Sequence, residues 1–111
     1  MHKKTGDCFI VAYRLAMSHG YKLVHALAIG QGPIKGIQYS HAFNLLESGE
    51  FGIDWVIDKS NGLDVKIPAA VYFKLGGIKV SKTYTRQEAM RHALETRNYG
   101  PWDPKILKNT S

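Results

Sequence analysis

The order of apolar and polar positions opens with a helix and continues with a strand. Apolar side chains cover most of a helical surface from residue 7 to residue 19, and Gly20 follows as a stop, which predicts a buried helix. Leu23 to Ile29 is a nearly continuous apolar run, typical of a strand that is buried on both faces. The glycine-rich residues 30–36 that follow predict an irregular connector.

Two more strands are predicted from Tyr39 to Glu47 and from Ile53 to Asp58. If they are joined by a two-residue loop at residues 49–50, counting outward from the loop places His41 directly opposite Asp58. Directly opposed residues share one face of a sheet with Cβ atoms about 5 Å apart, so a carboxylate there would reach an imidazole. A register slip of one residue would place the two on opposite faces.

The second half of the chain combines a short helix, a strand and a longer helix. After a turn at residues 59–62, a proline start and a Gly-Gly stop predict a helix from Pro68 to Leu75. Ile78 to Tyr84 alternates between apolar and polar residues, as a half-exposed strand does. Thr85 and Glu88 have the spacing of a capping box, which predicts a final helix behind them.

This order of elements predicts the α+β class. We expect an N-terminal helix packed on an antiparallel sheet of about four strands, with two further helices. Residues 1–111 are expected to form a single domain, because the length and the 44% apolar content suit one modest core. The polar residues 105–111 are expected to be a flexible tail.

The charge balance bears on partners and location. Lys and Arg number 15 against 9 Asp and Glu, and the resulting net charge of +6 favours contact with acidic surfaces. The positive charges are scattered and accompany no RNA-binding aromatic motif or zinc-finger spacing, so nucleic acid is not an expected partner. No signal peptide or long apolar segment is recognised, so we expect a cytoplasmic protein with no membrane partner. The oligomeric state stays open.

Cys8 is the only cysteine, and this raises the question of its role. A lone cysteine excludes an intramolecular disulfide, and without Cys/His ligand spacing neither a metal nor another cofactor is expected. Cys8 falls in the first turn of the predicted helix, where unbonded backbone N–H groups and the positive dipole end favour a thiolate. It is therefore either a small apolar packing residue or a nucleophile.

His41 and Asp58 follow Cys8 in an order that suits thiol chemistry. A cysteine hydrolase needs a thiolate to attack, a histidine to move the proton and a polar group to orient the imidazole. Each residue also has a structural explanation: His41 as a core histidine bonded to backbone, and Asp58 as part of a tight turn. Asn61 is an alternative orienter, three residues further along.

Three short segments together resemble the papain-like superfamily, and in particular its small transglutaminase-like branch. They are Gly6-Asp7-Cys8 at the opening of the helix, His41-Ala42-Phe43 at a strand start and Trp55-Val56-Ile57-Asp58 at the end of the next strand. The resemblance covers about residues 5 to 62 and implies a papain-like minimal core. It further implies Cys8 as nucleophile, His41 as general base and Asp58 as orienter, with a protein or peptide as substrate.

The chain departs from the larger members of that superfamily around the nucleophile. Phe9 replaces the familiar tryptophan after the cysteine, and no glutamine precedes Cys8 as oxyanion donor. The backbone N–H of Cys8 could supply one donor, and Gln31, Gln38 or Tyr39 the other. We favour Gln31, because the glycines around it allow close approach.

These observations lead to two functional hypotheses. The first is a papain-like cysteine hydrolase or acyltransferase that acts on an amide, isopeptide or ester bond through Cys8, His41 and Asp58. The alternative is a small basic binding or inhibitory protein that uses the same scaffold without catalysis. His25 is expected to be a hydrogen-bonded core residue rather than a second base, and Trp102 to anchor the chain end rather than wall a cleft.

Overall fold

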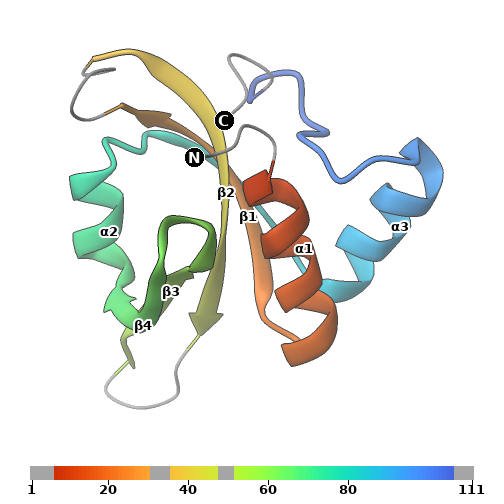
Figure 1. Ribbon diagram of the computed structural model, residues 1–111, viewed down its shortest axis with the longest axis horizontal. Helices are drawn as coiled ribbons and strands as arrows, with labels where there is room; N and C mark the ends of the chain where they lie inside the picture. The colour runs from red at the N-terminus through yellow and green to blue at the C-terminus, as the bar shows by residue number, and fades with distance from the viewer. Residues whose placement is uncertain (1–6, 31–35, 48–51, 107–111) are drawn as a thin grey trace.

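The computed structural model describes residues 7–30, 36–47 and 52–106 of the chain. Within them it contains three α-helices, one short 3₁₀ helix and five strands (Figure 1). In chain order these are α1 (Asp7–His19), β1 (Lys22–Ile29), β2 (Gln38–Glu47), β3 (Asp54–Asp58), the 3₁₀ helix η3 (Lys59–Asn61), β4 (Leu63–Pro68), α2 (Ala69–Leu75), β5 (Val80–Tyr84) and α3 (Arg86–Thr96).

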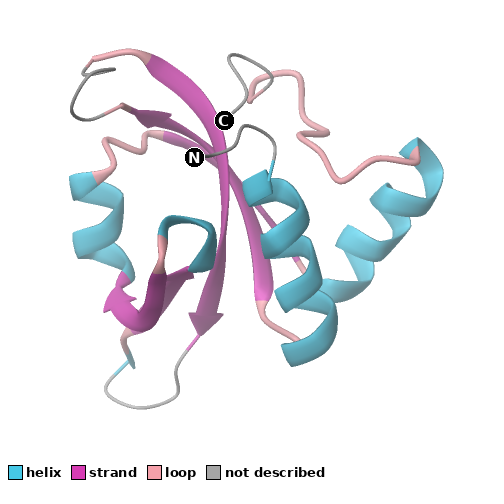
Figure 2. Cartoon of the chain, in the orientation of Figure 1, coloured by secondary structure: helices cyan, strands magenta, loops and turns pink. Residues whose placement is uncertain are grey.

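The five strands form one antiparallel sheet in the order β4-β3-β2-β1-β5. Figure 2 shows α1 and α3 on one side of the central strands and α2 on the other. The last strand, β5, returns to pair with β1, so the two ends of the described chain meet on the side of α1 and α3. The α+β class and the N-terminal helix packed on the sheet are thereby confirmed.

The alternation of side chains along β1 and β2 divides the interior into two clusters. Ala42 of β2 faces α1, whereas the next residue, Phe43, faces α2. The α1 cluster consists of Cys8, Phe9, Ala12, Ala16, Leu23, Ala42, Tyr84 and Ala89. The α2 cluster consists of Val24, Ala26, Phe43, Val56 and Tyr72.

Small side chains and one amide fix the position of α1 on the sheet. Ala12 and Ala16 are buried, so the backbone of the helix can approach β1 and β2 closely. The buried side chain of Asn44 on β2 donates a hydrogen bond of 2.9 Å to the carbonyl of Ala12. This bond crosses from sheet to helix and thereby sets the distance of α1 from the middle of β2.

The sheet has one strand more than the approximate four expected, because β4 forms a fifth. Its sequence, Leu63 to Pro68, alternates between apolar and polar residues, but the turn signal before it and the proline after it obscured this pattern. β4 is an edge strand that pairs only with β3. A proline is tolerated at its end because an edge strand has an unpaired side.

The predicted register between β2 and β3 is wrong by two residues. Leu45 pairs with Val56 and Glu47 with Asp54, whereas a loop at residues 49–50 would have paired Glu47 with Gly52. The loop itself lies outside the described residues. A shift of two preserves the face on which each side chain lies, because side chains alternate with period two. The inference that His41 shares a face with the end of β3 therefore survives the error in loop length.

The capping box at the start of α3 is confirmed by its hydrogen bonds. The backbone N–H of Glu88 donates to the hydroxyl of Thr85 at 3.1 Å, and the carboxylate of Glu88 accepts from the backbone N–H of Thr85 at 2.9 Å. Two backbone N–H groups that the helix leaves unbonded at its start are satisfied in this way.

We expect Thr85→Ala to lower the free energy of unfolding by about 1 kcal/mol, because it removes one of these two acceptors. Urea unfolding followed by circular dichroism measures the change. Glu88→Gln keeps an acceptor at the other position and serves as the control, with a smaller loss expected. Equal stability of Thr85→Ala and wild type would contradict the capping role.

Candidate functional site

The structure brings Cys8, His41 and Asp58 together at the N-terminal end of α1. Cys8 lies in the first turn of α1, His41 near the start of β2, and Asp58 is the last residue of β3. All three side chains are buried, with Cys8 and His41 each 4% exposed and Asp58 1% exposed. β3 ends at Asp58, and the 3₁₀ helix η3 follows it directly. α1 packs against η3, so the N-terminal end of α1 reaches the imidazole beyond the end of β3.

His41 and Asp58 form a direct buried contact. The ring nitrogen Nε2 of His41 lies 2.7 Å from Oδ2 of Asp58. If the observed pairing is extended by one residue beyond Asn44 and Ile57, Phe43 falls opposite Asp58 and His41 lies two positions along β2. The contact is therefore diagonal rather than directly opposed, which is still within reach of a histidine.

Asp58 accepts hydrogen bonds from several side chains besides His41. The hydroxyl of Ser60 donates to Oδ1 at 3.0 Å, and the amide of Asn61 donates to Oδ2 at 2.8 Å. The hydroxyl of Tyr72, which comes from α2, also donates to Oδ2. Both carboxylate oxygens are thus satisfied, and a buried negative charge needs such partners.

Asn61 supports Asp58 instead of replacing it as the partner of His41. The amide nitrogen of Asn61 lies 3.3 Å from Nε2 of His41, farther than the carboxylate oxygen at 2.7 Å. That amide nitrogen is a hydrogen-bond donor, so it can donate to the carboxylate of Asp58 but cannot accept an imidazole N–H. Of the two orienters considered from the sequence, Asp58 makes the stronger contact.

The electrostatics of His41 depend on both of its neighbours. Burial lowers the pKa of His41, but hydrogen bonds to Asp58 and to Cys8, with the charges of both groups, outweigh it and raise the pKa to about 10. For Asp58, burial raises the pKa, and the hydrogen bond and charge of His41 reverse this and lower it. At neutral pH the imidazole is therefore protonated and the carboxylate ionised.

The imidazole of His41 contacts Asp58 through Nε2 and is also hydrogen-bonded to the side chain of Cys8. These two partners are the ones that a catalytic imidazole would need, a group that orients it and a nucleophile. The described geometry thus brings a thiol, an imidazole and a carboxylate into contact, which are the three groups that the hypothesis of a cysteine hydrolase requires.

The oxyanion candidates are only partly described. Gln31 lies outside the described residues. Tyr39 is half-buried, and its ring centroid lies 5.8 Å from that of His41. Burial, together with the charges of Asp58 and Cys8, raises the pKa of the Tyr39 hydroxyl, so this side chain is neutral and faces the site.

Sequence reasoning missed two partners of Asp58. Ser60 stands only two residues after Asp58, and its hydroxyl reaches the carboxylate within the local turn. Tyr72 had no local signal, because its contact requires α2 to pack over the end of β3.

His25 and Trp102 lie outside this site. His25 is fully buried, but neither ring nitrogen has a hydrogen-bond partner among the described residues, so the expected hydrogen bond to its surroundings is wrong. Trp102 is half-buried and packs against the α1 cluster. It anchors the end of the chain to the core, as expected.

Searches for metal ligands and membrane spans returned nothing within the described ranges. No group of three or more His, Cys, Asp or Glu side chains there could hold a metal ion. No described helix is long and apolar enough to cross a membrane. Comparisons with protein-family models, with curated proteins and with solved structures gave no match.

We expect Asp58→Asn to lower the pKa of His41 by about 1–3 units, because the substitution removes the nearest negative charge. An NMR titration of the His41 ring, run in parallel on wild type and Asp58→Asn, measures the change. The raised pKa also links to stability. The stabilisation of the fold by protonated His41 is fully present below pH 6.5, decreases as pH rises and is lost at about pH 10.

The alkaline loss of stability should therefore be smaller in Asp58→Asn than in wild type. Urea midpoints between pH 7 and pH 10 test this second consequence. An unchanged His41 pKa in Asp58→Asn would refute the assignment of the ion pair.

Proposed function

We propose that the protein is a minimal papain-like cysteine hydrolase or acyltransferase that acts on an amide, isopeptide or ester bond of a protein or peptide. The observation that carries this proposal is the buried His41, which hydrogen-bonds to Asp58 through Nε2 and is also hydrogen-bonded to Cys8. A purely structural histidine does not require a cysteine at the start of a helix as its second partner. The resemblance in the order of the three residues adds support.

In the proposed reaction, the thiolate of Cys8 attacks the carbonyl carbon and forms a tetrahedral oxyanion. The imidazolium of His41 then gives its proton to the leaving amine or alcohol, and the bond to the carbonyl carbon breaks. Water or an amine next attacks the acyl-cysteine while His41 accepts its proton, and the thiolate leaves. Asp58 remains ionised throughout and holds the imidazole in place.

The oxyanion would be stabilised first by the backbone N–H of Cys8, which lies in the first turn of α1. Gln31 is the second donor that we propose, and Tyr39 is the described alternative because its ring lies beside His41. The reaction calls for no cofactor. We also propose a cytoplasmic location, where a reducing environment keeps Cys8 as a thiol.

The burial of the site favours one competing function. Because Cys8 and His41 are each only 4% exposed, a basic binding or inhibitory protein with an inert thiol is the second candidate. In that case the net charge of +6 would serve an acidic partner, and Cys8 would have no acyl intermediate.

We expect wild-type protein incubated with cell lysate to gain the mass of an acyl group on Cys8, detected by intact-mass spectrometry and peptide mapping. Cys8→Ala should carry no adduct while it retains the fold, as checked by circular dichroism. His41→Ala should form the adduct at least about a hundredfold more slowly, because the proton carrier is lost. Adducts of equal abundance in wild type and Cys8→Ala would rule out the nucleophile, and an unmodified wild type with a specific acidic partner would favour the binding protein.

A further inference from the structure

The chain after α3 forms a segment that we call the C-terminal strap, residues 98–106. In Figure 1 it runs from the end of α3 toward the end of α1 that carries Cys8. Trp102 packs on the α1 cluster, and Ile106 is 1% exposed. The hydroxyl of Ser40, the residue before His41, donates a hydrogen bond to the carbonyl of Ile106. The strap is therefore attached directly beside the candidate site.

The middle of the strap lies against His25. A Cβ added to Gly100 would meet Cε1 of His25 at 2.3 Å, and Gly100 has a φ of +107°, so only glycine fits there. The ring of Trp102 lies 4.8 Å from the His25 ring. Phe9 and Tyr84 enclose the ring from α1 and β5, at 4.8 Å and 5.2 Å between centroids.

The described groups packed around His25 do not favour a positive charge on its ring. His92 on α3 stacks on Trp102 at 5.0 Å, and its charge opposes protonation of His25. Lys82 on β5 pairs with His25 across the sheet and is also cationic. Glu88 on α3 and Asp103 on the strap act on the hydroxyl of Tyr84, and neither is among the groups that shift the pKa of His25. β2 contributes the apolar Ala42 opposite His25, and α1 contributes Phe9.

We propose that the C-terminal strap is an acid-labile cover: it closes the Cys8 site while His25 is neutral, and it opens when acid protonates His25. This inference deepens the proposed function, since it assigns a regulation to the same site. The His25 ring is fully buried, and neither of its nitrogens has a hydrogen-bond partner in the described part of the chain, so it can accept a proton only if its surroundings move. Of the elements that touch the ring, the strap is the one without helix or strand structure.

The size of the effect follows from proton linkage. Burial, with a smaller effect of His92, lowers the pKa of His25 from 6.5 to about 3 in the closed state. An exposed His25 in the open state would regain the ordinary value, so acid favours the open state between those two limits. From pH 7 to pH 4.5 the ratio of open to closed strap should rise on the order of 100-fold.

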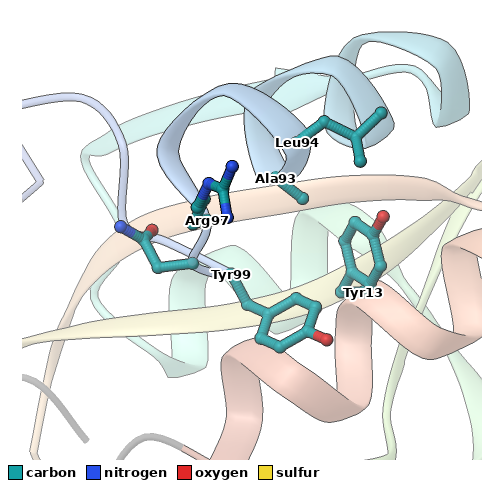
Figure 3. Close-up of a pocket in the computed structure, with 6 residues that line it drawn as sticks. Tyr13, Ala93, Leu94, Arg97 and Tyr99 are labelled. Atoms are coloured by element: carbon teal, nitrogen blue, oxygen red, sulfur yellow. The ribbon is translucent and has the colours of Figure 1, made fainter.

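A surface hollow marks where the strap can pivot. It has a volume of about 530 Å³ and lies between α1 and α3 (Figure 3). The first two strap residues, Asn98 and Tyr99, line it together with Tyr13, Ala93, Leu94 and Arg97. The strap thus begins beside open space and not on a packed core, and such regions open at low free-energy cost.

Hydrogen exchange tests the opening. The indole N–H of Trp102, which donates to the carbonyl of Asn98 at 3.2 Å, and the amide of Ile106 report on the strap. Their protection factors, corrected for intrinsic exchange, should fall on the order of 100-fold from pH 7 to pH 4.5 in wild type. His25→Phe should remove most of this fall, whereas His19→Gln should keep it.

His25→Leu is a second, smaller replacement, in case phenylalanine is not accommodated. Amides of β1 report whether each variant remains folded. An undiminished fall in a folded His25→Phe or His25→Leu would overturn the role of His25.

Labelling of Cys8 with dipyridyl disulfide tests the cover itself. Trp102→Ala should raise the labelling rate at pH 7 at least about tenfold, because it removes the ring that anchors the strap. A rate unchanged in Trp102→Ala, despite faster exchange in the strap, would show that the strap does not cover the thiol. Failure of the proposed function looks different: the strap opens and Cys8 labels as expected, but no acyl adduct forms on Cys8 in wild type or Trp102→Ala.

Discussion

The candidate site depends on the buried carboxylate of Asp58, because this one group connects three parts of the fold. It ends β3, accepts the ring N–H of His41 from β2, and accepts the hydroxyl of Tyr72 from α2. A buried charge with any of these partners removed would be costly, so the contacts hold one another in place. The imidazole is positioned by the packing of the sheet against α2 as much as by its own strand.

Cys8 reaches this arrangement from the opposite cluster. α1 packs on the face of the sheet away from α2, and Asn44 ties the carbonyl of Ala12 to β2. β3 is short, so the N-terminal end of α1 and η3 occupy the level at which His41 lies. A longer β3 would put backbone where the thiol and the imidazole meet. The early end of β3 thus leaves room for the candidate site.

The local sequence predicted those features that depend on neighbouring residues. The bounds of α1, the capping box of α3 and the face shared by His41 and Asp58 follow from periodicity and from single side chains. The register of β2 on β3 depends on a loop length that composition does not determine, and the error of two residues was harmless only because it was even. The contact of Tyr72 with Asp58 joins segments whose relative position is set by tertiary packing, and no local pattern encodes it.

The two fully enclosed histidines show how burial produces opposite charge states in one small domain. Burial lowers the pKa of both rings, but at His41 the hydrogen bonds of Asp58 and Cys8 reverse the shift, whereas His25 has no hydrogen-bond partner among the described residues and keeps the lowered pKa. As pH rises to about 10, the protein loses the contribution of protonated His41. As pH falls, protonation favours any state in which His25 is exposed, and the contribution of ionised Asp58 is later lost as well. The His41–Asp58 ion pair and the neutral His25 ring therefore coexist only at pH values between these acid and alkaline limits. His25, the group that responds first to acid, lies under the C-terminal strap and not in the candidate site.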